Sequence, residues 1–325
     1  MSFDQIIGHS RSINLLQKSI ENNSISHSYL FEGEDGIGKK LVAKIFAKTL
    51  LCKEGQTTPC NKCSSCKKID NDSHPDLIMI SPEKGMIRKP QIDEMIKNAT
   101  KLPFESERKI FIIDDSHTMN IESKNAILKT LEEPASFINI ILISSNPDNL
   151  LPTILSRVES IKFFPIKIDE IENYLTNNYK LDDNKAKFIA RFTKGAIGKC
   201  ITIAEDESFF ENREEVIDII VGLINGDLSK AFSSNDFFEE NKENIDEILD
   251  MFTYFFRDIL IYKNLQNADL IVNLDKEDIL SQAMFLEDEK INKVIQSIEE
   301  TKINIKRNIN FQLAIEVMLL NIGGK

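Results

Sequence analysis

Short apolar runs alternate with longer amphipathic stretches through the first 165 residues. Five runs have the length and the Ile, Leu and Phe content of buried strands: residues 29–31, 77–80, 110–113, 140–143 and 161–164. Helical spacing lies between them, at residues 41–51, 91–99 and 123–131, and Pro134 marks the end of the third helix. Buried strands that alternate with helices predict a five-stranded parallel α/β sheet.

Beyond Pro165 the strand signals fade and helical spacing replaces them. Residues 168–179 and 184–192 read as short helices, and another helix begins at Lys199. Nearly all of the remaining chain has helical spacing. The pattern predicts three domains: an α/β domain over residues 1–165, a small helical domain over 166–205 and an all-helical domain over 206–325.

Two helices of the last predicted domain have a recognisable face. One carries an apolar stripe at helical spacing, formed by Ile291, Val294, Ile295 and Ile298. The last helix has a single polar stripe on an otherwise apolar rod, formed by Asn308, Gln312 and Glu316. This composition predicts that the last helix is mostly buried.

The net charge of −12 is distributed unevenly along the chain. Residues 1–205 hold 28 basic and 27 acidic residues (+1), and residues 206–325 hold 12 and 25 (−13). A strongly acidic segment is a poor candidate for gripping phosphate backbones. Any contact with nucleic acid is therefore expected in the N-terminal part.

The sequence also predicts where the protein works. It starts without a basic segment followed by an apolar one, and no apolar run reaches the ~18 residues that a membrane span needs. We therefore expect a cytoplasmic protein with no membrane association. Its five cysteines should be reduced, and a clustered set is better interpreted as metal ligands than as disulfides.

A glycine-rich segment follows the first predicted strand and opens the first helix. Residues 33–40 read Gly-Glu-Asp-Gly-Ile-Gly-Lys-Lys, in which Gly33, Gly36, Gly38 and Lys39 match a phosphate-binding P-loop. The residue after the lysine is normally Ser or Thr, which ligates Mg²⁺, but here it is Lys40. Nucleotide binding and a ligand-free strand-to-helix turn both stay open at this point.

A second acidic element supports the P-loop interpretation. The apolar run at 110–113 ends in Asp114 and Asp115, as in a Walker B strand, where the first acid supports magnesium and the second polarises water. Related ATPases usually carry Glu at the second place, so Asp115 would reach less far. The alternative is a strand end with two solvated acids.

Four cysteines lie within fifteen residues, at Cys52, Cys60, Cys63 and Cys66. This spacing suits a tetrahedral zinc site with four thiolate ligands, and a site without an open position is structural. We expect nearby lysines to offset its charge: Lys53, Lys62, Lys67 and Lys68. The alternative is a set of unliganded thiols. Cys200 stands apart and is expected in the core.

The combined motifs resemble the clamp-loader AAA+ family of bacterial DNA polymerase III, most of all its delta-prime subunits. The resemblance covers residues 1–160 and rests on the P-loop, the cysteine module, the acidic strand, His74-Pro75-Asp76, residues 125–134 (NAILKTLEEP) and residues 153–157 (TILSR). It implies an AAA+ domain, a helical lid and a helical collar domain for oligomerisation. It also implies a heteropentameric ring with tau/gamma and delta subunits that loads a sliding clamp onto primed DNA.

The resemblance gives roles to single residues. Arg157 would be an arginine finger offered in trans to the ATP of a neighbouring subunit, although a surface arginine is the simpler interpretation without the family. Cys52, Cys60, Cys63 and Cys66 would hold zinc, and residues 144–146 would occupy the region that senses the γ-phosphate.

Two departures from the ATP-hydrolysing members concern hydrolysis. The P-loop has Lys40 for Ser or Thr, and the lid stretch at residues 195–198 (GAIG) lacks an arginine that the motor subunits carry. Arg157, which serves a neighbour, is kept. The pattern predicts a non-hydrolysing subunit that is not an enzyme by itself. The alternatives are an ATP-hydrolysing motor subunit of the tau/gamma type and a zinc protein that binds DNA alone.

Overall fold

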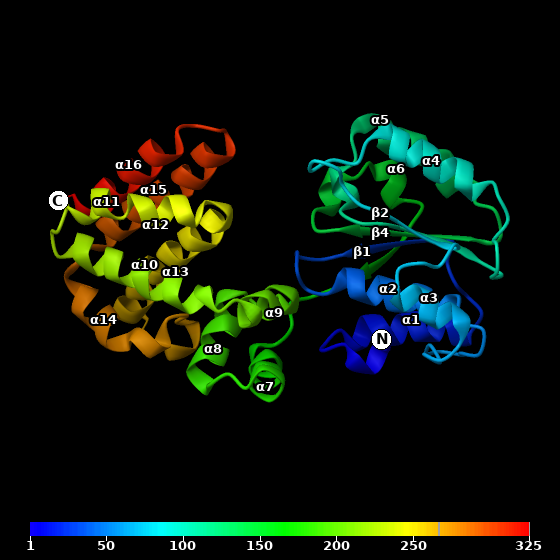
Figure 1. The fold of residues 1–325 in the computed structure, drawn as a ribbon, viewed down its shortest axis with the longest axis horizontal. Helices are drawn as coiled ribbons and strands as arrows, with labels where there is room; N and C mark the ends of the chain where they lie inside the picture. Colours follow the sequence, from blue (N-terminus) through cyan, green and yellow to red (C-terminus); the bar gives the residue numbers. More distant parts are fainter. Residues whose placement is uncertain (266, 325) are drawn as a thin grey trace. The chain divides into compact units, whose positions relative to one another are not determined.

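The structure is a computed structural model that describes residues 1–265 and 267–324 (Figure 1). The chain forms two compact units. The first contains Met1–Ile171 and Lys194–Lys199, and the second contains Glu172–Thr193 and Cys200–Lys325. The residues predicted to form a lid, 166–205, are thus divided between the units, and the predicted three-domain division stays a prediction.

The first unit contains a five-stranded parallel sheet, as the sequence predicts. Its strands are β1 (Ser28–Glu32), β2 (Leu77–Ile80), β3 (Lys109–Ile113), β4 (Ile138–Ser144) and β5 (Glu159–Lys162), in the order β2-β3-β4-β1-β5. All four pairings are parallel, with Phe31 beside Ile143 and Ile161 on its two sides. The carboxyl ends of β1, β3 and β4 therefore meet at one edge.

The structure shifts the last strand as a whole, whereas β1, β3 and β4 contain their predicted runs and extend them by one or two residues. The apolar run predicted a strand at 161–164, and the structure has β5 at Glu159–Lys162. This strand lies at the edge of the sheet, and only Ile161 of its four residues is buried. Its first two residues are polar, so the apolar run begins two residues after the start of the strand.

Helices cover both faces of the sheet (Figure 1). One core joins alternate strand residues such as Phe31 and Ile141 to α1 (Ser10–Glu21) and α2 (Lys39–Leu50). The other joins Leu30, Phe111 and Leu142 to α4 (Lys89–Ala99) and α5 (Ile121–Glu132). Two short helices complete the unit, α3 (Ser64–Asp70) and α6 (Pro152–Leu155). α5 ends two residues before Pro134, as predicted.

The second unit contains helices and no strand among its described residues. Its helices are α8 (Asp183–Phe192), α10 (Ser208–Ile224), α11 (Lys230–Ser233), α12 (Asn235–Glu240), α13 (Ile245–Asn264), α14 (Glu277–Gln282), α15 (Asp288–Lys306) and α16 (Phe311–Gly323). α7 (Ile168–Tyr179) and α9 (Ile197–Glu205) each begin in the first unit and end in the second. No helix in the described ranges is long and apolar enough to cross a membrane.

The last helix differs from its prediction. Asn308 has a φ of 57° and precedes α16, so only Gln312 and Glu316 of the predicted polar stripe are on the helix. Three of its apolar residues are also exposed: Leu313, Val317 and Leu320. The prediction of a mostly buried helix is therefore wrong, because apolar residues lie on its outer face as well as its inner one.

Candidate functional site

The loop between β1 and α2 has the backbone of a phosphate-binding turn. Gly33, Gly36 and Gly38 have φ values of 153°, 77° and 101°, in a region that favours glycine. Gly33 also leaves no space for a side chain, because an added Cβ would lie 2.5 Å from the carbonyl oxygen of Phe163. The loop leads into the N-terminus of α2, where the helix dipole favours an anion.

Lys39 is buried and folds back onto this loop. Its ammonium group donates to the carbonyl oxygens of Gly33 (2.5 Å) and Glu34 (2.6 Å). Burial lowers the pKa of Lys39, and the carboxylates of Asp35 and Asp115 act in the opposite direction. The ammonium group therefore lies within the loop, where it holds two of the loop carbonyls.

Two further loop carbonyls have protein partners that the sequence did not predict. The carbonyl oxygen of Gly36 accepts the backbone N–H of Gly198 at 2.6 Å. The carbonyl oxygen of Ile37 lies 2.6 Å from Nε2 of His9, which therefore carries the proton and donates. An added Cβ on Gly198 would lie 2.8 Å from the Gly36 oxygen, so this approach requires glycine. The glycine stretch that lacks the motor subunits' arginine thus contacts the phosphate loop.

Lys40 and Asp114 form an ion pair beside the loop. The Lys40 ammonium lies 2.8 Å from Oδ2 of Asp114. Lys40 is in the first turn of α2, and Asp114 directly follows β3. The strand order brings the two together, because β1, β4 and β3 are neighbours and end at the same edge. The position after Lys39 and the first acid are the places where a P-loop ATPase holds Mg²⁺. Here the ammonium group of Lys40 supplies the positive charge that Mg²⁺ would otherwise bring to Asp114.

Asp115 lies next to this pair with an unusual backbone. Its φ is 45° and its ψ is 46°, in the left-handed region. Burial raises the pKa of Asp115, and the neighbouring Asp114 and Asp35 raise it further. The carboxyl group is thus held among like charges at the end of β3.

All of the predicted nucleotide-binding residues except Gly33 line one open cleft. It is lined by Met1, Asp35, Gly36, Gly38, Lys39, Lys40, Leu41, Lys44, Asp114, Asp115, Ile143 and Gly198. The predicted sensor region adjoins it, because Ile143, which lines the cleft, directly precedes Ser144. Predictions made from separate segments therefore converge on a single place.

The four clustered cysteines lie together after α2. Their sulfur atoms are all within 4.8 Å of one another, and Cys52 lies 3.6 Å from Cys66 and 3.9 Å from Cys63. A tetrahedral zinc ion with Zn–S bonds of about 2.3 Å separates its sulfur ligands by about 3.8 Å. The sulfur positions therefore fit a metal ion of this kind.

Backbone N–H groups also point at these sulfur atoms. Gly55 and Cys60 donate to Sγ of Cys52 at 3.1 and 3.3 Å, and Cys66 donates to Sγ of Cys63 at 3.4 Å. Cys63 is the N-cap of α3, and this helix places Cys66 in its first turn. The four sulfur atoms and these donors thus suit a metal ion bound by four cysteines.

A buried lysine of α2 forms hydrogen bonds with the cysteine module. Lys48 is 1% exposed, and its ammonium donates to Oδ1 of Asn61 (2.6 Å) and to both carboxylate oxygens of Asp70 (2.8 and 2.7 Å). Asn61 lies between the second and third cysteines, and Asp70 ends α3. Lys48, which the sequence analysis did not single out, therefore links α2 to the cysteine module. Of the predicted neighbours, Lys68 pairs with Glu105.

Arg157 lies at the amino-terminal ends of the strands, whereas the phosphate loop lies at their carboxyl ends. It precedes β5, whose first residue, Glu159, pairs with Tyr29 near the start of β1, whereas the loop follows the end of β1. Its guanidinium contacts Oε1 of Glu132 (2.7 Å), the carbonyl oxygen of Thr153 (2.7 Å) and Oγ of Ser156 (3.0 Å). Arg157 thus does not belong to the cleft of its own chain, and Glu132 is a partner that sequence reasoning missed.

Comparisons with known proteins agree with these features. Models of two families match the chain, DNA polymerase III, delta subunit at residues 8–167 and DNA polymerase III, delta subunit, C terminal at residues 207–323. The DNA polymerase III subunit delta' of Bacillus subtilis is 31% identical over 315 residues, which are 95% of this chain and 94% of the relative.

More distant similarities include longer proteins. The gamma/tau subunit of Mycoplasma genitalium is 27% identical over 97% of this chain but 55% of the relative. A solved gamma subunit-related protein from Thermotoga maritima covers 96% of this chain and 98% of its own, with 16% identity and a TM-score of 0.48. Because the similarity to the delta-prime relative extends along nearly the full length of both proteins, the chain belongs to the DNA polymerase III delta-prime family.

Proposed function

We propose that this chain is a clamp-loader subunit that does not hydrolyse ATP itself. The Lys40–Asp114 ion pair carries the proposal. In a P-loop ATPase, Mg²⁺ neutralises the phosphate oxygens and organises the reaction. A lysine at the place of the magnesium-binding hydroxyl, paired with the acid that supports the ion, removes both ligands. The chain then acts as a binding protein in a larger enzyme.

We further propose that Arg157 completes the ATP site of an adjacent subunit. It is too far from its own phosphate loop to contact a nucleotide bound there, since Arg157 lies at the amino-terminal ends of the strands and the loop at their carboxyl ends. Its side chain is 33% exposed, so it is accessible to a neighbour. An arginine supplied in trans stabilises the charge that develops on the transferred phosphoryl group.

The family supplies the setting for this role. We propose a heteropentameric ring in the cytoplasm with tau/gamma and delta subunits, which loads a sliding clamp onto primed DNA. In this ring residues 1–165 form an AAA+ domain, 166–205 a lid and 206–325 a collar. Cys52, Cys60, Cys63 and Cys66 hold a structural zinc ion, for which the sulfur spacing is the support.

Reconstitution with the motor and delta subunits tests the proposal. Arg157→Ala should lower turnover at the site it completes by about 10³-fold or more, so the DNA-stimulated rate of the ring falls to that of its remaining sites. Arg11→Ala, an exposed arginine on α1, is the control. An unchanged rate with Arg157→Ala would exclude the finger. Magnesium-dependent hydrolysis by the isolated chain, abolished by Lys39→Ala, would instead favour the motor alternative.

A further inference from the structure

The loop between α4 and β3 exposes two apolar side chains. Leu102 is 73% and Phe104 is 80% exposed, the highest fractions among the large apolar side chains that the structure describes. The loop, residues 100–108, belongs to no helix or strand. Because these apolar side chains are not buried, their burial cannot fix the shape of the loop. The shape therefore depends on hydrogen bonds and ion pairs of the loop.

A buried carboxylate holds the second half of this loop. Asp76 directly precedes β2 and is fully buried. Its Oδ1 accepts the backbone N–H of Phe104 at 2.6 Å, and its Oδ2 accepts those of Glu105 and Ser106 at 3.0 Å each. Hydrogen bonds to an ionised carboxylate are stronger than those between neutral groups. One side chain therefore fixes the backbone of residues 104–106.

His74 connects this carboxylate to the cysteine module. Its Nδ1 accepts the backbone N–H of Asp76 at 3.1 Å, so the neutral ring carries its proton on Nε2. Nε2 lies 3.0 Å from Oγ of Ser65 and 3.5 Å from Oγ of Ser106. Because the hydroxyl of Ser65 donates to the carbonyl oxygen of Leu51 at 2.7 Å, it accepts from the ring. A buried chain of hydrogen bonds thus extends from Ser65 to the loop.

Ser65 belongs to the cysteine module. It is fully buried in the first turn of α3, between Cys63 and Cys66. Its hydrogen bond to Leu51 reaches the residue before Cys52. When four cysteines share one metal ion, the end of α2 and the start of α3 are held together. The Ser65 hydroxyl is then held in place with them.

A second contact joins α3 to the loop. The ammonium of Lys68 donates to both carboxylate oxygens of Glu105, at 2.5 and 2.8 Å. The first half of the loop is held differently, through Lys109 at the start of β3. Its buried ammonium donates to three backbone carbonyl oxygens between residues 98 and 102. The cysteine module is therefore connected to residues 104–106, whereas the sheet holds residues 98–102.

We propose that the cysteine module has a function beyond its own folding, which is to hold residues 104–106 in the shape that presents Phe104 to solvent. The inference rests on the metal site proposed above. Without the metal, Ser65 has no fixed position, and His74 and the Asp76 carboxylate lose the support that it gives. Exposed loops with few packed contacts open locally at a low cost in free energy. The loop then opens while the rest of the unit stays folded.

Hydrogen–deuterium exchange of the full-length chain tests this inference, because the backbone N–H groups of residues 104–106 are themselves the donors to Asp76. The test variant is Ser65→Ala, which removes the hydroxyl and keeps all four cysteines. Ser64→Ala, at the exposed neighbouring residue of α3, is the matched control. Wild-type chain depleted of metal with a chelator forms a second arm. Elemental analysis measures the zinc content of every sample.

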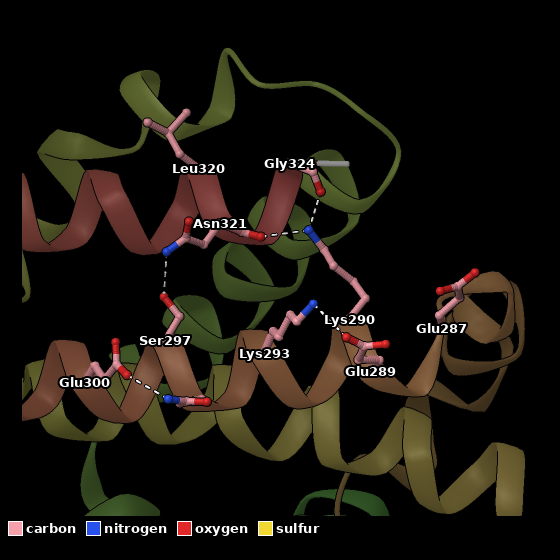
Figure 2. A pocket seen from close by; sticks show the side chains of 10 residues that line it. Glu287, Glu289, Lys290, Lys293, Ser297, Glu300, Leu320, Asn321 and Gly324 are labelled. Atoms are coloured by element: carbon pink, nitrogen blue, oxygen red, sulfur yellow. Dashed lines mark hydrogen bonds and ion pairs between the residues drawn. The ribbon is translucent and has the colours of Figure 1, made fainter.

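Helices α15 and α16 of the second unit give an internal reference. The ammonium of Lys290 on α15 donates to the carbonyl oxygens of Asn321 (2.8 Å) and Gly324, and the amide of Asn321 donates to Oγ of Ser297 at 3.0 Å (Figure 2). These contacts lie within the second unit, so exchange there should not respond to the cysteine module. An acceleration equal to that of the loop would show general unfolding and would overturn a specific connection.

We expect residues 104–106 to exchange at least about ten-fold faster in Ser65→Ala with its zinc retained, and in the metal-depleted wild type. The control should change the rate less than about two-fold. Unchanged exchange in the metal-depleted chain would overturn the inference while leaving the metal site standing. Wild-type chain without zinc after purification with zinc present would instead contradict the metal site, and the inference with it.

Discussion

The ammonium nitrogen of Lys40 lies 2.8 Å from a carboxylate oxygen of Asp114, across two neighbouring elements that meet at the carboxyl edge of the sheet. The pair joins the two motifs that an ATPase uses to hold its magnesium ion. A cation carried on the protein thus neutralises the acid permanently, whereas magnesium arrives with the nucleotide.

Replacing this lysine should open a site for a divalent cation. In Lys40→Thr, Asp114 loses its partner and a hydroxyl takes the usual magnesium-binding place. We expect Mn²⁺ binding in the presence of ADP, measured by electron paramagnetic resonance, to appear in the variant and to be absent from the wild type. Lys44→Thr, one turn further along α2, removes an equal charge but leaves Asp114 paired. If Lys44→Thr binds Mn²⁺ equally well, the effect is one of net charge only.

The cysteine module should contain about one zinc ion per chain. Because four thiolates bind the ion in the folded state, its removal costs folding free energy. We expect Cys63→Ser to lose the metal in elemental analysis and to unfold at a lower temperature. Cys200→Ser is the control, since Cys200 is buried beside Thr193 and outside the cluster. Wild-type chain that lacks metal after purification with zinc present would contradict the prediction.

Glu132 should position Arg157 for its neighbour. Exposed ion pairs contribute about 0–1 kcal/mol, and the guanidinium keeps its contacts with Thr153 and Ser156 when the carboxylate is lost. We therefore expect Glu132→Gln to lower the DNA-stimulated kcat of the reconstituted ring by up to about five-fold, less than Arg157→Ala does. Glu133→Gln is the control on the adjacent residue. A higher rate in Glu132→Gln would mean that the ion pair restrains the arginine.

Asp115 should make stability depend on pH. Its pKa is raised in the folded chain, chiefly by burial and then by Asp114 and Asp35. Below the ordinary pKa of an aspartate, the carboxyl is protonated in both states and carries no penalty. As the pH rises, the unfolded chain ionises first, so the free energy of unfolding falls until the pH passes the raised folded value.

Removing this charge should therefore stabilise the protein at neutral pH. Asn tolerates the left-handed backbone of position 115, so Asp115→Asn should raise the urea midpoint at pH 7, and the gain should shrink as the pH approaches 3.8. Asp148→Asn, at an exposed acid in the same unit, is the control. An equal gain at every pH would show that backbone preference and not ionisation is responsible.

The sequence by itself determined most of the architecture of the first unit. Buried parallel strands are continuous apolar runs, so β2 was predicted with its observed bounds and β1, β3 and β4 within two residues at each end. The phosphate loop and the cysteine module are local motifs, in which spacing alone defines the geometry. The edge strand β5 was placed two residues late, because half-exposed strands do not need apolar residues throughout.

Only the tertiary structure decided which distant residues meet. Strand order, which a linear pattern does not contain, brings Lys40 to Asp114 and separates Arg157 from its own phosphate loop. The approach of Gly198 to Gly36, the burial of Lys48 and the partner of Arg157 are likewise contacts between segments far apart in the chain. The apolar content of α16 predicted burial, but the packing of its neighbours covers only one side. Periodicity shows that a helix has an apolar face, whereas the number of faces that the chain itself covers depends on the surrounding fold.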